Sequence, residues 1–400
     1  MRLQGLLYPV RSVKKLRSRL ATHLHIRTFA RHGQQRFQGD DRYNLENVSD
    51  GFRSRVDGTS DDTSILERIC DSYHAATNDR NARQNSASLT DWANTNPDTR
   101  LDAFRKALLT RDLAALARMC KNFYRDACSS GLLAPPGGLA KAYFSGPIGD
   151  TYRHFYMSHV LYRLDYWKTL TDGKYAIQAL AGPGIGNPFG VVLDGTHVAV
   201  GAEHSHYCAR RVIEQIPSGK TTVAEVRGGF GGIAYYVLRD RPGIRYIDID
   251  IPEYLALASY YLMKAFPHLQ FLCYGEKPIT SRSIDEVDIV FVPRHVLHGL
   301  PSSSVDMTYT VFGLSSLSAE ATSHCLDGID RITNDLLFLI SNKDKAGDVL
   351  EVMQAQHRSF ELVDTHQTGW HSHKVSGAGV GGAANREASM ILEQSYARRS

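Results

Sequence analysis

Short apolar runs alternate with longer amphipathic segments between residues 221 and 341. The runs TTVAEV, RYIDI, QFLCY, DIVFVP, DMTYTVF and DLLFLIS have the length and composition of buried strands. The segments GGIAYYVLRD, PEYLALASYYLMKAF and 318–333 lie between some of these runs and have the apolar spacing of helices. Strands that alternate with helices in this way predict an α/β fold, a mostly parallel sheet between two helical layers.

The pattern before residue 221 is different and predicts a mostly helical region over residues 60–170. Apolar residues recur at steps of three and four over 101–125, which predicts a helix that restarts with Thr110 as its cap. The stretch TYRHFYMSHVLYRLDYW over 151–167 is also compatible with a helix. AGPGIGNPFG at 181–190 contains too many glycines and prolines for a regular element and predicts a loop. A further short helix is expected over 201–216.

Both ends of the chain lack this periodicity. Residues 1–39 contain no Asp or Glu but nine Arg and Lys, and residues 40–64 are rich in Asp, Arg, Ser and Gly. We therefore expect a basic flexible tail and linker over 1–58, a helical region and connector over 59–200, the sheet domain over 201–345 and a C-terminal extension over 346–400. Residues 376–400 look flexible. The basic segment is also compatible with an organelle presequence or with weak contact to an anionic membrane surface.

Composition narrows the class of protein. The chain has 400 residues, of which 42% are hydrophobic and 22% charged, as in a globular protein of one or two domains. A formal net charge of +4 is too small to indicate a nucleic-acid-binding protein. The six cysteines show no metal-ligand or disulfide spacing, which favours reduced thiols and a cytoplasmic location. No apolar run approaches the roughly 20 residues of a membrane-spanning helix.

The stretch AEVRGGFGG at 224–232 contains a glycine-rich loop that matches two cofactor-binding patterns. Gly229, Gly231 and Ala234 match a dinucleotide fingerprint, with Asp250 at the distance of the acid that binds a ribose; this interpretation predicts an NAD-dependent oxidoreductase. Alternatively, Glu225 stands directly before the glycines, where a carboxylate repels a diphosphate but suits the positively charged methionine end of S-adenosylmethionine. Asp250 does not distinguish the two, because both cofactors carry an adenosine ribose.

Several segments, in this order, resemble one family. VAEVRGGFGGIAYYVL, IDIDIPEYLALASYYL, VDIVFVPRHVLHGLPSSSVDM and the GNP at 186–188 are similar to the sugar O-methyltransferases of bacterial surface-polysaccharide gene clusters. The resemblance covers roughly residues 65–342. It implies a class I methyltransferase fold, S-adenosylmethionine as methyl donor and the hydroxyl of a sugar or glycan as acceptor. It also implies donor-binding roles for Glu225, Gly228, Gly229, Gly231 and Asp250.

The sequence departs from the family pattern at two places. Arg227 stands where the family has a glycine. The family also has a strand that ends in an asparagine, followed by a Ser/Glu pair. Here VFGLSSLSAE stands in its place, and only Ser318 and Glu320 resemble that pair. We expect the Arg227 backbone to stay in an ordinary conformation and its side chain to reach solvent or pair with Glu225. A methyltransferase fold with a degraded donor loop, acting as a binding or scaffold protein, therefore stays open.

A general base would assist methyl transfer to a hydroxyl, and three residues near predicted strand ends are candidates. His295 directly follows the strand DIVFVP, and Glu320 lies at the start of the helix over 318–333; we expect these two to be catalytic. His298 is the third candidate. Alternatively, the histidines have no catalytic role, and Glu320 is present because an acid is favoured in the first turn of a helix. The HSHY at 204–207 lacks a carboxylate cluster, so we expect no metal.

Overall fold

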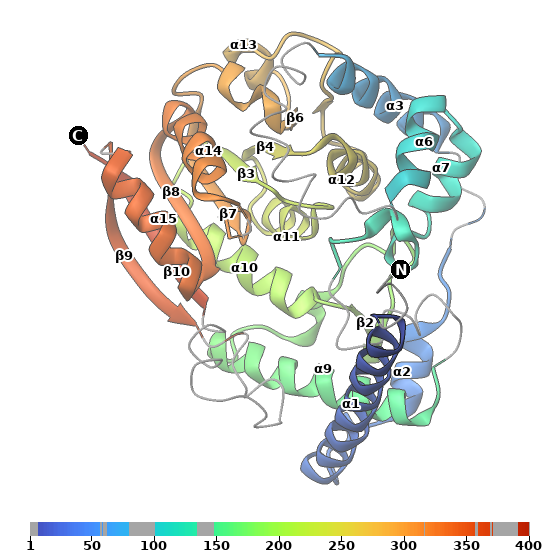
Figure 1. Cartoon of the computed structure of the whole chain (residues 1–400). Helices are drawn as coiled ribbons and strands as arrows, with labels where there is room; N and C mark the ends of the chain where they lie inside the picture. Colours follow the sequence, from blue (N-terminus) through green and yellow to red (C-terminus); the bar gives the residue numbers. More distant parts are fainter. Residues whose placement is uncertain are drawn as a thin grey trace, which may run out of the picture.

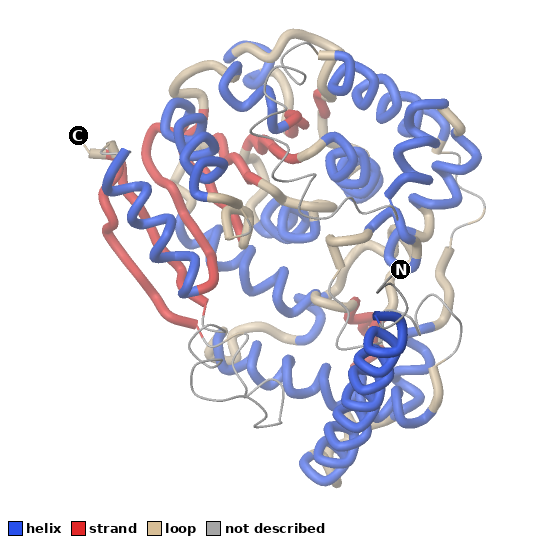
Figure 2. The backbone as a smooth tube through the Cα atoms, viewed as in Figure 1, coloured by secondary structure: helices blue, strands red, loops and turns tan. Residues whose placement is uncertain are grey.

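The computed structural model describes residues 7–56, 58, 62–79, 101–133, 148–315, 317–356, 359–368, 370 and 391–399. Its centre is an eight-stranded sheet with strand order β5-β6-β4-β3-β7-β8-β10-β9, coloured red in Figure 2. β10 is antiparallel to both of its neighbours, and the other pairings are parallel. The strands are β3 (Thr222–Val226), β4 (Arg245–Asp250), β5 (Phe271–Leu272), β6 (Ile289–Pro293), β7 (Val305–Val311), β8 (Thr333–Asn342), β9 (Phe360–Thr368) and β10 (Ile391–Arg398).

Helices cover both faces of this sheet (Figure 1). One apolar core lies between the sheet and α10 (Ala202–Gln215), α11 (Gly232–Asp240) and α12 (Pro252–Ala265). A second core lies between the sheet and α13 (Ser281–Asp285), α14 (Ala319–Ile332) and α15 (Lys343–Gln356). β3 and β6 are buried along their whole length because both of their faces are covered. The predicted α/β class, a mostly parallel sheet between two helical layers, is confirmed.

The expected helical region is present before the sheet. It contains α3 (Thr63–Asn78), α6 (Asp102–Thr110), α7 (Leu113–Cys120), α9 (Asp150–Leu170) and the 3₁₀ turns η2 (Phe123–Arg125), η3 (Ala127–Ser129) and η4 (Ile177–Leu180). The helix predicted over 101–125 is broken, because Arg111 adopts a φ of 54°. Its second part is capped by Asp112, which accepts a hydrogen bond from the backbone of Ala115 (3.0 Å), so the prediction of Thr110 as cap is wrong. A hairpin of β1 (Gly190–Leu193) and β2 (Thr196–Ala199) was not predicted.

The predicted tail and linker over 1–58 is wrong for the described residues. Helix α1 (Leu7–Arg36) packs against α9 (Figure 1). Ile26 and Phe29 of the helix, and Phe37 directly after it, are buried in the first core. Helix α2 (Leu45–Phe52) replaces the linker, and its Gly51 lies against the backbone of β1. The flexible tail was predicted because the basic residues of this segment repel one another. Burial of the apolar side chains offsets that repulsion. Membrane-surface contact by this segment stays a prediction, and no described helix is long and apolar enough to cross a membrane.

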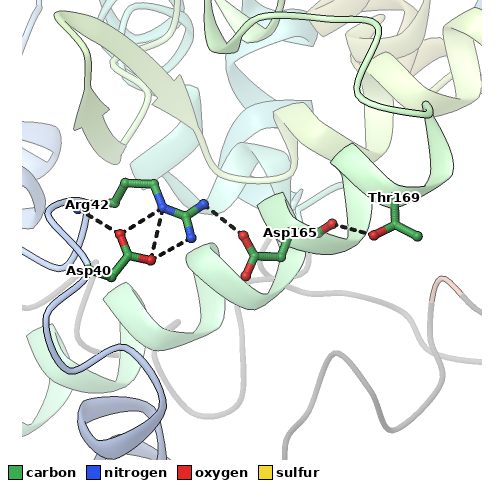
Figure 3. Close-up of polar contacts among 4 residues, drawn as sticks. All are labelled: Asp40, Arg42, Asp165 and Thr169. Carbon is green, nitrogen blue, oxygen red and sulfur yellow. Dashed lines mark hydrogen bonds and ion pairs between the residues drawn. The ribbon is translucent and has the colours of Figure 1, made fainter.

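A polar network joins the segment after α1 to α9 (Figure 3). The Arg42 guanidinium binds Asp40 (2.6 Å between Nη2 and Oδ2) and reaches Asp165 of α9 (2.8 Å between Nη1 and Oδ1). The hydrogen bonds from Arg42 lower the pKa of Asp40. Thr169 donates to the Asp165 carbonyl one turn earlier (2.9 Å). The network fixes the direction in which the chain leaves α1.

The predicted boundary at residue 345 is also wrong, because the sheet continues to Arg398. β10 inserts between β8 and β9, so the residues expected to form a separate C-terminal extension complete the sheet. Residues 376–390 of the segment expected to be flexible lie outside the described residues, whereas 391–398 form β10. Buried Glu393 of β10 accepts hydrogen bonds from Tyr207 and Arg211 of α10, which joins the strand to the helical layer. The six cysteines are buried free thiols, as expected.

Candidate functional site

The glycine loop lies between β3 and α11, at the carboxyl edge of the parallel strands. Gly229 and Gly231 adopt φ values of 69° and 86°, a left-handed conformation that favours glycine. A Cβ atom at Gly231 would lie 3.1 Å from Leu262, so the loop packs closely on α12. A Cβ atom at Gly228 would lie 2.4 Å from the Glu225 carboxyl group. Backbone conformation therefore favours glycine at two positions, and the space beside Glu225 favours it at a third.

Asp250 is the last residue of β4, and the structure brings it to the glycine loop as predicted from the sequence. Its Oδ2 accepts a hydrogen bond from the Gly229 backbone (3.0 Å) and its Oδ1 accepts one from Ile251 (2.7 Å). The side chain is only 1% exposed. Burial raises the pKa of Asp250 to about 6, against the lowering effect of Arg227 and the two backbone donors.

Glu225 lies beneath the loop and is held by tyrosines from the neighbouring strands. The Tyr246 hydroxyl donates to Glu225 Oε2, and the hydroxyls of Tyr246 and Tyr309 hydrogen-bond to each other. Burial raises the pKa of Glu225, and the tyrosine hydrogen bonds partly offset this rise. Its predicted role at the positive end of the donor stays a prediction.

Asp248 is a buried acid that the sequence analysis missed. It pairs with Glu225 across β3 and β4, two residues before Asp250 on the same face of the strand. The residue is fully buried, and no described residue hydrogen-bonds to either carboxylate oxygen. Burial, followed by the charges of Glu225 and Asp250, raises its pKa well above the ordinary value. The sequence IDIDI could have indicated it, because alternate residues of a strand share a face, which places Asp248 on the same face as Asp250.

The predicted conformation of Arg227 is wrong in two respects. Its backbone adopts a φ of 67°, a region that is costly for a residue with a side chain. Its guanidinium donates to the Gly313 carbonyl after β7 rather than pairing with Glu225. Burial lowers the pKa of Arg227 to about 10, with Asp250 opposing this shift and Arg294 adding to it. The positive charges of Arg227 and Arg294 both lower the pKa of Asp250.

The proposed bases lie elsewhere along the carboxyl edge. His295 belongs to the 3₁₀ turn η5 (Arg294–Gly299), with Nε2 3.7 Å from Asp79 Oδ2, and burial lowers its pKa. Glu320 is exposed in the first turn of α14. His298 approaches the His324 carbonyl (3.0 Å from Nε2). None of the three lines the cavity described next, and their catalytic roles stay predictions.

A cavity of about 330 Å³ adjoins the glycine loop. Its wall includes Phe230 from the loop and Phe312 from the end of β7, with the rest supplied by α9, β2, the start of α10 and the segment at 132–133. The polar lining residues are His159, Arg163, Glu203, His204 and Ser205. The sequence analysis identified none of these as binding residues. Among the described residues, no group of three or more His, Cys, Asp and Glu is placed to hold a metal ion.

No family model matches the chain, and no curated protein matches its sequence. Matching solved structures include the magnesium protoporphyrin IX methyltransferase of Synechocystis PCC 6803 with bound SAM (14% identity, TM-score 0.32, 49% of this chain and 81% of that one). They also include the precorrin-6y C5,15-methyltransferase of Geobacter metallireducens (12% identity, TM-score 0.32, 52% and 91%). The mitomycin 7-O-methyltransferase matches at 14% identity with a TM-score of 0.31 over 50% of this chain and 55% of that one. These likenesses are too distant to indicate a substrate.

Proposed function

We propose that the protein is an S-adenosylmethionine-dependent methyltransferase. The observation that carries the proposal is the hydrogen bond from the Gly229 backbone to Asp250, which joins the glycine loop to the acid at the end of the next strand. A ligand of a parallel α/β sheet binds at this edge. Each Asp250 oxygen accepts one backbone N–H, and a carboxylate oxygen has a second acceptor site for a ribose hydroxyl.

The acid beside the loop fits S-adenosylmethionine better than the NAD cofactor of the alternative with Gly229, Gly231 and Ala234. Asp250 lies beside the loop, and its pKa of about 6 leaves it largely ionised at neutral pH, where its charge repels a pyrophosphate. Glu225 and Asp248 lie beneath the loop, and burial raises the pKa of both, so they add to this repulsion only where they are ionised.

We infer that the acceptor is a sugar hydroxyl. The resemblance to sugar O-methyltransferases supports this, and so does the aromatic cavity next to the loop. When bound, S-adenosylmethionine would supply the methyl group for displacement by the hydroxyl oxygen. The chain would orient the acceptor and exclude water, which are large contributions to such a reaction.

Calorimetric titration with S-adenosylmethionine tests the donor site. Replacing Asp250 with Ala removes an ionic acceptor of ribose hydroxyls, so we expect donor affinity to fall at least about tenfold. Asp285→Ala is the control, because Asp285 has a 61% exposed side chain and pairs with Arg245 at the opposite end of β4. Equal donor affinity in Asp250→Ala and the parent protein would show that the loop assignment is wrong.

A non-catalytic binding or scaffold protein is the second candidate. The observation that favours it is the combination of a nearly inaccessible Asp250 and a half-buried, left-handed Arg227 that acts electrostatically on it. In this state Asp250 presents almost no surface to a ligand. Failure of both the parent protein and Arg227→Gly to bind S-adenosylmethionine, with both proteins folded, would support this candidate.

A further inference from the structure

The cavity beside the glycine loop contains a buried ion pair from two helices. Arg163 of α9 donates through Nε to Oε1 of Glu203 in the first turn of α10. The two side chains are 13% and 7% exposed, and both line the cavity. The Arg163 guanidinium also lies over the Trp370 ring, 5.1 Å from its centroid. Contacts on two sides therefore fix the direction of this guanidinium.

The pair has hydrogen-bonding capacity that the described protein groups do not use. No described residue accepts a hydrogen bond from Nη1 or Nη2 of Arg163, and none donates to Oε2 of Glu203. None of these atoms is among the buried polar atoms without a partner, so they are accessible from the cavity. Water can hydrogen-bond to them there, and a ligand with adjacent hydroxyl groups can take the place of that water, accepting from Arg163 and donating to Glu203.

The remaining lining indicates a ligand without net charge. The charges of Arg163 and Glu203 oppose each other, and burial lowers the pKa of His159 to about 3, which keeps its imidazole neutral near pH 7. Tyr156, Phe230 and Phe312 provide aromatic surface. A volume of about 330 Å³ lies within the size range of small-molecule sites. Aromatic surface with one donor–acceptor pair suits a ring that is apolar on its faces and hydroxylated at its edge.

We propose that this cavity binds the acceptor as a neutral pyranose ring, with neighbouring hydroxyl groups held by Arg163 and Glu203. The proposal rests on the methyltransferase function and deepens it, because the cavity shares Phe230 with the donor loop. It assigns to Arg163 and Glu203 a binding and positioning role.

Saturation-transfer NMR with named glycosides tests the site in the full-length protein. The neutral probes are the methyl α-pyranosides of D-glucose, D-mannose and L-rhamnose, and D-glucuronate is the anionic probe. We expect transfer to at least one neutral glycoside and weaker transfer to D-glucuronate. Arg163→Lys and Glu203→Gln should each reduce affinity for that glycoside about tenfold, since each removes a hydrogen bond to a charged group.

Two further variants separate binding from folding. Val160→Phe places a ring in the cavity and leaves the ion pair intact, so it should abolish transfer while thermal unfolding stays cooperative. Arg153→Lys is the matched control, because Arg153 pairs with Asp150 on the same helix and does not line the cavity. It should bind the glycoside as the parent does.

The outcomes distinguish this proposal from the proposed function when S-adenosylmethionine is titrated into the same samples. Donor affinity should stay within about twofold in the cavity variants. Donor binding without transfer to any neutral glycoside would overturn the cavity proposal and leave methyltransferase function standing. Glycoside binding that Val160→Phe removes, without donor binding, would support the cavity and contradict the methyltransferase. Preference for D-glucuronate, or transfer that persists in all the cavity variants, would overturn the proposal.

Discussion

Asp248 shows how a single buried carboxyl group makes stability depend on pH. Its pKa is raised in the folded protein, whereas in an unfolded chain an aspartate has a pKa of about 3.9. As pH rises above that value, the unfolded chain releases a proton that the folded protein keeps. The folded state then binds more protons, so its stability falls as pH rises towards the folded-state pKa.

Asp248→Asn should therefore stabilise the protein, and more so at higher pH. In the parent protein, folding at high pH requires Asp248 to be buried either as a charged carboxylate without a partner or in a protonated form, and both cost free energy. The amide of asparagine has no ionised form and avoids this cost. We expect the free energy of unfolding at pH 8 to rise by about 2 kcal/mol, with the difference shrinking towards pH 4. Urea denaturation across this pH range measures it. Asp306→Asn is the control, because Asp306 accepts a hydrogen bond from the Thr222 backbone (2.8 Å); an equal gain there would contradict the explanation.

Arg227 should affect the proposed donor site through both its backbone and its charge. The left-handed backbone is costly for arginine, and the half-buried guanidinium would repel the sulfonium of a donor. Arg227→Gly should tighten binding of S-adenosylmethionine by about 1 kcal/mol or more, roughly fivefold, in calorimetric titration. Arg227→Ala separates the two causes, since it removes the charge but keeps a Cβ atom. Unchanged affinity in both variants would show that the arginine is tolerated and the donor site intact.

At the scale of elements, α1 supports the helix that forms one wall of the cavity. Phe29 of α1 packs edge-on against Phe155 of α9, with ring centroids 5.2 Å apart, and is near the ring of His159 (6.5 Å). His159 lines the cavity, so α1 packs on residues next to those that would contact a ligand. A segment expected to be a mobile tail thus becomes part of the support of the site.

A pair of variants on α1 tests this packing. Phe29 is 3% exposed and Leu24 is 63% exposed on the same helix. Phe29→Ala should lower the free energy of unfolding by about 3 kcal/mol or more, the usual cost of deleting a buried aromatic ring. Leu24→Ala should change it by less than about 0.5 kcal/mol. Chemical denaturation measures both, and similar small effects would show that α1 does not pack on α9 in solution.

At the scale of the whole molecule, the C-terminal strands close the sheet. β10 pairs with β8 along Ile391–Ala397 and joins α10 through Glu393. A chain that ended at residue 345 would leave the backbone groups of β8 unpaired at a new sheet edge. It would also expose the apolar side chains that β10 covers.

A chain ending at residue 345 should therefore lose cooperative thermal unfolding, measured by circular dichroism. The control is a chain lacking only residues 399 and 400, which follow β10 and should melt close to the full-length protein. A cooperative transition in the shorter chain would mean that the unit predicted over 201–345 folds without its last strands.

Local periodicity was sufficient for the strands from β3 to β8 and for α11, α12 and α14, but not for the short helix α13. It also predicted that Asp250 and the glycine loop belong to one site. Strand and helix patterns report which positions are buried, and a strand–loop–helix–strand order places the glycine loop beside the end of the next strand. Asp250 and Gly229 were therefore predictable. Tertiary structure alone decided the left-handed Arg227, which depends on the Gly313 carbonyl after another strand, and the place of β10 between β8 and β9. It also decided the pairing of Arg163 with Glu203, because that contact depends on how α9 packs on α10, which the periodicity of neither helix specifies.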